Sequence, residues 1–227
     1  MNREDVLDAV VVSFVANARR VRDPHLPLHR RLSALSSCVV LYCPFGFQGT
    51  LAFLELEAGA FHGDEDALLR ALEVLEDLRA RWQVEAAAYA EVRRAEKRAG
   101  RRVPDPRVPN PHLRLRQNDL ATGAKYRLRL WADRPARVPA DALETAVQRC
   151  VRACLECGFG AEERAHLGNC LSAAEQRLAR STDSDEYRRW RKLLDVARLV
   201  QQATAVEGAD TAEVPGDAES CIRGNKA

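Results

Sequence analysis

Residues 112–131 alternate apolar with basic side chains, and this pattern constrains the fold more than any other stretch of the chain. Successive side chains of a β-strand point to opposite faces of a sheet, so leucines would gather on one face and cations on the other. Residues 118–123, between the two alternating runs, are of types that form tight turns. The segment therefore predicts a β-hairpin with one apolar face and one basic face.

The basic face of this hairpin belongs to a longer cationic stretch. Residues 93–137 hold fourteen Lys and Arg against four Asp and Glu, a net charge of +10 in a chain whose total is +2. Cations that face one another across a strand pair repel, so an anion is expected to neutralise them. A concentrated basic patch is typical of proteins that bind nucleic acid. The predicted binding residues are Arg101, Arg102, Arg114, Arg116, Lys125, Arg127 and Arg129.

RNA is favoured over DNA as the partner of this basic stretch. Two alternatives stay open: an acidic protein partner, and a solvated edge hairpin whose cations only block aggregation.

The remaining elements follow from periodicity and from turn residues. A second, mostly buried hairpin is expected over residues 37–57, whose apolar runs flank a turn around Pro44. Helical spacing of apolar residues predicts helices over residues 3–22, 64–99, 140–157, 161–180 and 184–205. The predicted fold class is α+β and predominantly helical, with two short β-hairpins and about five helices.

Four prolines in residues 100–111 predict the main boundary within the chain. Proline fixes φ and has no N–H to donate, so this stretch is expected to be an extended linker. The predicted units are an N-terminal part (1–99), the linker (100–111), a basic hairpin with a three-helix lobe (112–205) and a disordered tail (206–227).

The predicted helix over residues 64–99 begins at Asp64, a favourable N-cap residue, and is long for a chain of this size. Its apolar stripe consists of Leu68, Leu72, Leu75, Trp82 and Tyr89. Such a stripe is usually ordinary core. The alternative is a partner-docking face, through which the chain would form a homodimer or another oligomer.

One group of residues has metal-ligand spacing. The pattern C-x2-C-x8-H-x3-C is formed by Cys154, Cys157, His166 and Cys170. Two cysteines separated by two residues can bind one ion, and a His and a Cys four apart share one face of a helix. Zinc is the expected cofactor, with buried free thiols as the alternative. The pattern is similar to CCHC zinc modules in general, but its middle spacing is longer than that of the retroviral zinc knuckle, so it assigns no family.

The sequence carries no Walker loop, G-x-G-x-x-G, H-E-x-x-H or G-x-S-x-G motif, so a non-catalytic protein is expected. It also has no apolar run long enough to cross a bilayer and no positive region before the first apolar run, which predicts an intracellular protein, cytoplasmic or nuclear, without membrane contact. A basic stretch before a Cys/His cluster resembles the layout of small viral nucleic-acid-binding proteins. The expected function is that of a nucleic-acid-binding accessory protein. The alternative is an oligomeric scaffold that docks through residues 64–99 and binds an acidic partner.

Overall fold

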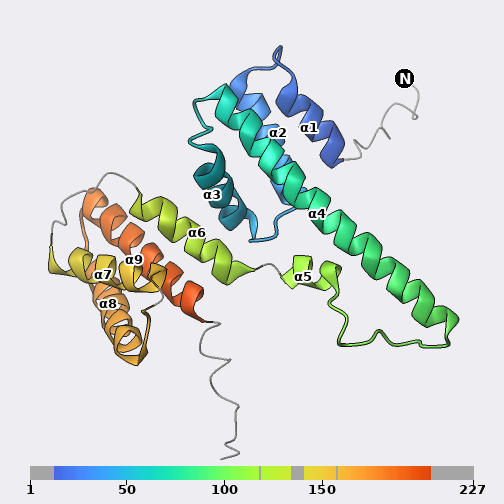
Figure 1. Cartoon of the computed structure of the whole chain (residues 1–227). Coiled ribbons are helices and arrows are strands. Elements are labelled where there is room, and N and C mark those ends of the chain that lie inside the picture. The colour runs from blue at the N-terminus through green and yellow to red at the C-terminus, as the bar shows by residue number, and fades with distance from the viewer. Residues whose placement is uncertain (1–12, 118, 134–140, 157, 206–227) are drawn as a thin grey trace, which may run out of the picture.

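The computed structural model describes residues 13–117, 119–133, 141–156 and 158–205, and these residues form nine helices and no strand (Figure 1). In chain order the helices are α1 (Phe14–Arg22), α2 (Leu28–Leu41), α3 (Phe47–Ala58), α4 (Glu65–Arg98), α5 (Pro111–Gln117), α6 (Leu120–Ala132), α7 (Ala142–Leu155), α8 (Ala161–Arg180) and α9 (Ser184–Thr204). The predicted α+β class with two β-hairpins is therefore wrong, and the described fold is all-α.

The hairpin expected over residues 37–57 is replaced by the end of α2, a turn and α3. The apolar run that suggested a strand continues a helical stripe that starts earlier in α2. Its buried residues are spaced by three and four along the helix: Arg31, Ala34, Leu35, Cys38 and Val39. Tertiary burial of this stripe outweighs the β propensity of the valines.

The hairpin expected over residues 112–131 is replaced by α5 and α6. The residues predicted to form its turn have other roles. Asp119 is the N-cap of α6, and its carboxylate accepts hydrogen bonds from the Thr122 backbone N–H at 2.9 Å and from the Thr122 hydroxyl at 2.6 Å. Gly123 is buried inside the helix. Turn-forming and helix-capping residues are the same types, and here capping prevails.

The helices expected over residues 64–99, 140–157, 161–180 and 184–205 are confirmed. α4 begins after Asp64, whose side chain accepts hydrogen bonds from two backbone N–H groups, and it runs for 34 residues. α7, α8 and α9 match the three helices predicted between residues 140 and 205. Of the helix expected over residues 3–22, α1 is described; residues 1–12 lie outside the described part, as does the predicted tail 206–227.

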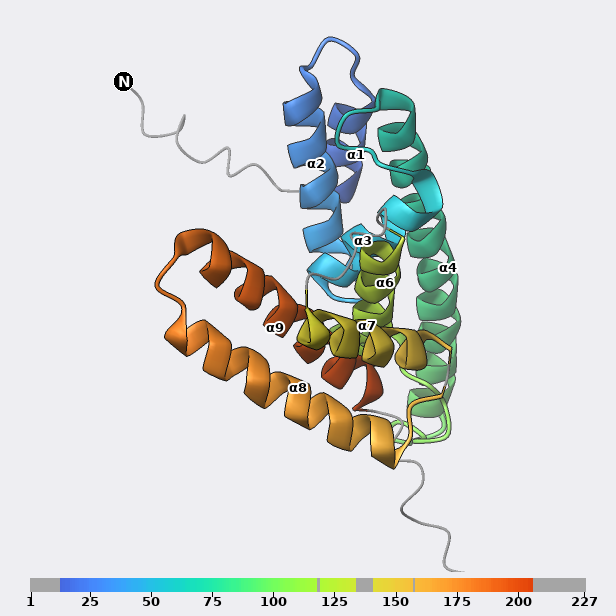
Figure 2. The ribbon, with the colours of Figure 1, turned by 90° about the vertical axis from the view of Figure 1, so that its left-hand side faces the viewer.

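Two clusters of buried side chains organise the fold. One unites α1 to α4, and the other unites α6 to α9. The chain passes from the first cluster to the second between Leu115 of α5 and Ala124 of α6. This passage lies C-terminal to the linker predicted at residues 100–111. α6 packs on α3 as well as on α9, so this helix connects the two clusters (Figure 2).

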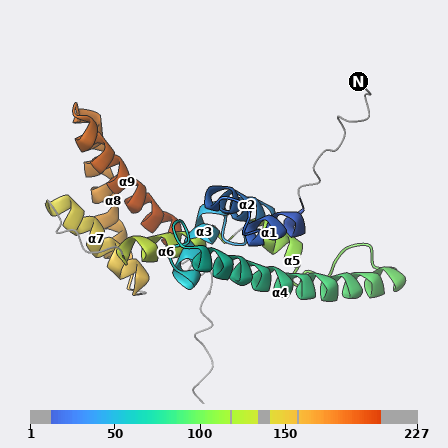
Figure 3. The ribbon, with the colours of Figure 1, turned by 90° about the horizontal axis from the view of Figure 1, so that it is seen from above.

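α4 extends well beyond the helices that pack against it. All its fully buried residues lie in its first third, between Ala67 and Leu75. The far end projects away from α1 and α2, and the chain returns beside it to α5 (Figures 1 and 3). Among the described residues, no helix combines the length and apolar character that crossing a bilayer requires.

Candidate functional site

The far end of α4 and the chain that returns from it form a strongly basic surface, here called the arm tip (residues 93–107). This segment holds seven Arg and Lys against two carboxylates. Six of the seven cations are exposed. Within the described residues, four of these exposed cations have no ion-pair partner: Lys97, Arg98, Arg102 and Arg107. The arm tip therefore presents uncompensated positive charge on a part of the molecule that reaches into solvent.

The arm tip is held in shape by Glu96, whose side chain is only 10% exposed. Its carboxylate pairs with Arg93 and accepts a hydrogen bond from the Asp105 backbone N–H at 3.2 Å. The Arg93 guanidinium also donates to the Arg102 carbonyl at 3.2 Å. Gly100 makes the reversal after α4 with a φ of 80°, a conformation that favours glycine. The exposed cations thus project from an ordered turn.

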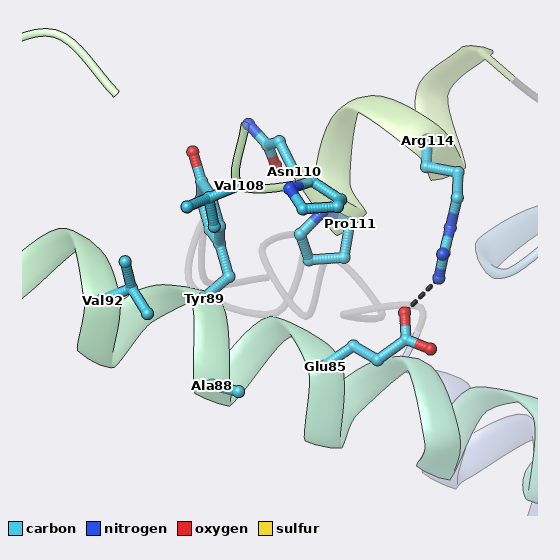
Figure 4. Close-up of a pocket in the computed structure, with 9 residues that line it drawn as sticks. Glu85, Ala88, Tyr89, Val92, Val108, Asn110, Pro111 and Arg114 are labelled. Carbon is cyan, nitrogen blue, oxygen red and sulfur yellow. Dashed lines mark hydrogen bonds and ion pairs between the residues drawn. The ribbon is translucent and has the colours of Figure 1, made fainter. Parts of the chain in front are cut away.

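A shallow groove of about 330 Å³ lies between α4 and the segment that returns to α5. Figure 4 shows Tyr89 and Val92 of α4 facing Val108 and Pro111 across it. The Trp82 indole N–H donates to the Pro111 carbonyl at 3.1 Å and so attaches the returning chain to α4. The proline-rich stretch is therefore packed along the helix at this end and is not a free spacer.

The predicted nucleic-acid-binding residues fall into separate groups. Arg101 and Arg102 are exposed at the arm tip, whereas Arg114 pairs with Glu85 beside the groove (Figure 4). On α6, Arg129 is exposed, whereas Lys125 and Arg127 are half-buried. The side chain of Arg116 lies outside the described part of the structure. The described residues of 112–131 form no common basic face, because a helix turns by about 100° per residue and separates alternate side chains.

The binding residues predicted from the sequence do not include the cations at the start of the arm tip. Arg93, Arg94, Lys97 and Arg98 belong to the basic stretch but not to the predicted binding set. The sequence indicates these cations indirectly, because the predicted helix over residues 64–99 continues beyond its apolar stripe and ends in basic residues.

The apolar stripe of α4 divides between core and groove. Leu68, Leu72 and Leu75 have no exposed surface and form part of the N-terminal core. Trp82 is half-buried beside Tyr42 and His112, with ring centroids 6.0 and 5.4 Å away. Tyr89 lines the groove. The three leucines are therefore not available as a docking face in this fold.

A second candidate site lies where α7 packs on α8. Cys150 of α7 and His166 and Cys170 of α8 place one ligand atom each within 4.8 Å of one another. Both cysteines are almost fully buried, and His166 is half-buried. These three residues form a group that could bind a metal ion.

The ligand set differs from the one predicted. The structure brings His166 and Cys170 together as expected. Cys154 is buried one turn from Cys150 but does not belong to the described group, and Cys157 lies outside the described residues. The predicted ligand set does not include Cys150, because the C-x-x-C pair of Cys154 and Cys157 has the more typical metal-ligand spacing. Cys150 lies on the apolar stripe of its helix, so the sequence alone does not distinguish it from a buried thiol.

Comparisons with protein-family models, with curated proteins and with solved structures found no match.

Proposed function

We propose that this protein is a non-catalytic nucleic-acid-binding protein that contacts phosphates with the arm tip. The observation that carries the proposal is the exposed, unpaired positive charge of Lys97, Arg98, Arg102 and Arg107 at the end of a helix that projects beyond its core. Cations without a carboxylate partner repel one another, and phosphates that bind to them lower the free energy by neutralising this charge. RNA is the expected nucleic acid, and the cytoplasm or the nucleus the expected compartment.

Two features of the arm favour a polyanion over a small ligand. The cations lie on a convex, projecting segment, whereas small molecules usually bind in concave, mostly apolar sites. The contacts of Glu96 also hold the backbone of the turn from which the basic side chains project. Ordering these residues before binding reduces the entropy that association costs.

The alternative function is a scaffold that binds an acidic protein partner. An acidic peptide offers the same negative charge to the arm tip, so charge alone does not separate the two functions. The groove lined by Tyr89, Val92 and Val108 would supply apolar contacts to a peptide but not to phosphates. Oligomerisation through Leu68, Leu72 and Leu75 is no longer part of this alternative, because those residues are core.

The cofactor part of the proposal is zinc. Two thiols and an imidazole are donors that suit this ion, and zinc would serve to stabilise the C-terminal helices. In this proposal the zinc has no contact with the nucleic acid.

The test is binding of a fluorescent single-stranded RNA of mixed sequence, followed by anisotropy. Changing Lys97, Arg98, Arg102 and Arg107 together to Gln should weaken binding at least tenfold. A matched control changes four exposed cations outside the arm to Gln: Arg20, Arg30, Arg152 and Lys192. Equal loss in both variants would contradict the proposed site, and stronger binding of a poly-glutamate peptide than of RNA would favour the scaffold.

A further inference from the structure

The group between α7 and α8 is arranged by helical spacing. His166 and Cys170 are separated by four residues on α8, so their side chains share one face of that helix. Cys150 faces them from α7, which packs directly on α8. The connection between the two helices is short, spanning residues 156–160, and this keeps the facing residues in register.

One polar atom of this group has no partner in the described part of the protein. The Nε2 atom of His166 is buried and has no hydrogen-bond partner among the described residues. An unpaired buried polar atom costs free energy, which a bound ligand can recover. The Sγ atoms of Cys150 and Cys170 lie within 4.8 Å of each other, and both side chains are almost fully buried.

A candidate for a fourth donor lies on the same face of α8, outside the group of three ligand atoms that lie within 4.8 Å of one another. Glu163 precedes His166 by three residues and Cys170 by seven, and it is half-buried. One of its oxygens, Oε2, accepts a hydrogen bond from the Gly160 backbone N–H at 2.8 Å, which orients the carboxylate at the start of the helix.

We infer that Cys150, His166 and Cys170 hold one zinc ion, which joins α7 to α8, and that the carboxylate of Glu163 turns toward this ion as the fourth ligand. The inference rests on the zinc of the proposed function and names its ligands and its role. Zinc in structural sites has four ligands in a tetrahedron, and thiolate, imidazole and carboxylate all belong to its usual donors. Each thiol would lose its proton on binding, and the ion would compensate the charge of the two buried thiolates.

The role of such an ion would be to stabilise the packing of the C-terminal helices. The hydrogen bond from Gly160 to Glu163 would then be an outer contact that orients a ligand. Contacts of this kind typically contribute tenfold to a hundredfold to metal affinity.

The test begins with the zinc content of the full chain, purified without chelator, by elemental analysis. The wild-type chain should hold close to one equivalent. Cys150→Ser, His166→Ala and Cys170→Ser should each lose it, whereas Cys43→Ser, which changes a half-buried thiol in the N-terminal cluster, should keep it. Retention of zinc in Cys150→Ser together with its loss in Cys157→Ser would overturn the ligand set and restore the C-x-x-C pair.

Cobalt substitution separates the ligands when a variant folds poorly. Cobalt added to the metal-free wild-type chain should give the charge-transfer absorption of a thiolate complex. Glu163→Gln should keep this absorption, shift the visible bands and lower affinity at least about tenfold, the smallest loss typical of an outer contact to a ligand. Unchanged bands and affinity in Glu163→Gln would overturn its assignment as a ligand. A wild-type chain that binds neither zinc nor cobalt would instead show that the zinc proposal itself is wrong.

Discussion

Gly49 of α3 and Gly123 of α6 bring their helices into backbone contact: a Cβ atom added to Gly49 would lie 2.5 Å from the Cα atom of Gly123. A Cβ atom added to Gly123 would lie 2.1 Å from the Phe45 carbonyl oxygen. The crossing is reinforced by the Asp119 backbone N–H, which donates to the Pro44 carbonyl at 2.8 Å. This close approach joins the helix that connects the two clusters to the N-terminal cluster.

The crossing predicts a large effect of one methyl group. Gly123→Ala should lower the free energy of unfolding by about 3 kcal/mol, the upper end of the usual cost of overpacking, because the added carbon meets backbone atoms that cannot rotate away. Gly168→Ala is the matched control: Gly168 lies within α8 with open space around it, and alanine should stabilise the chain by about 0.5–1 kcal/mol. Urea unfolding followed by circular dichroism measures both changes. Equal stability of the two variants would contradict the close crossing.

Asp141 predicts a specific sensitivity to acid. Its carboxylate caps α7 and pairs with Arg177 of α8 and Arg189 of α9. Burial raises the pKa of Asp141, but the hydrogen bonds from the Glu144 and Leu143 backbones and from Arg177 outweigh it, so the pKa lies below its ordinary value of 3.8.

The stability that this carboxylate contributes is therefore present above about pH 4 and is lost as the pH falls through its folded pKa. Asp141→Asn keeps a good capping residue and removes the charge, so it should cost about 1 kcal/mol at pH 7 and progressively less in acid. Asp195→Asn, which removes an exposed pair with Arg191, should change stability by less than about 0.5 kcal/mol. A deficit of Asp141→Asn that stays constant down to pH 2 would contradict this assignment.

Glu96 should control the order of the arm tip. Glu96→Gln weakens the ion pair with Arg93 and the hydrogen bond to the Asp105 N–H, so residues 100–107 should exchange amide hydrogens about tenfold faster. Glu91→Gln removes an exposed pair with Arg94 on the same helix and should leave this exchange unchanged. Hydrogen exchange followed by mass spectrometry reports on the segment directly. Identical exchange in the two variants would show that Glu96 does not hold the turn.

The stripe on α4 should behave as core. Leu72→Ala should lower the free energy of unfolding by about 2–5 kcal/mol, because Leu72 has no exposed surface. Val84→Ala, at a side chain that is 70% exposed on the same helix, should have an effect within about 0.5 kcal/mol. The Leu72→Ala loss should not depend on protein concentration. A midpoint that rises with concentration in the wild-type chain and not in Leu72→Ala would point to the partner face.

How well the fold could be predicted depended on the length of each apolar pattern. α4 and α9 carry stripes over several turns, and α4 also has a clear cap in Asp64, so helical spacing was unambiguous. α3 is apolar nearly all round, with buried residues on several faces, so a short apolar run there looked like a buried strand. In α6, alternation of leucine and arginine concealed a helical stripe through Ala124 and Leu128.

The candidate sites were predicted in part for a related reason. His166 and Cys170 could be paired from their spacing on one helix, but Cys150 approaches them only through the packing of α7 on α8. The basic stretch was visible as charge in the sequence. Which of its cations are free of carboxylates depends on contacts between distant residues, such as the pair of Arg114 with Glu85, which are 29 positions apart.

The salt dependence of RNA binding tests the central proposal most directly. Each phosphate contact with single-stranded nucleic acid contributes about 0.7 to the slope of log affinity against log salt concentration. Changing Lys97, Arg98, Arg102 and Arg107 to Gln should therefore reduce the magnitude of the slope by up to about 3. The control variant with Gln at positions 20, 30, 152 and 192 should keep the wild-type slope. Equal slopes for the arm variant and the wild-type chain, with both chains folded, would contradict phosphate binding by the arm tip.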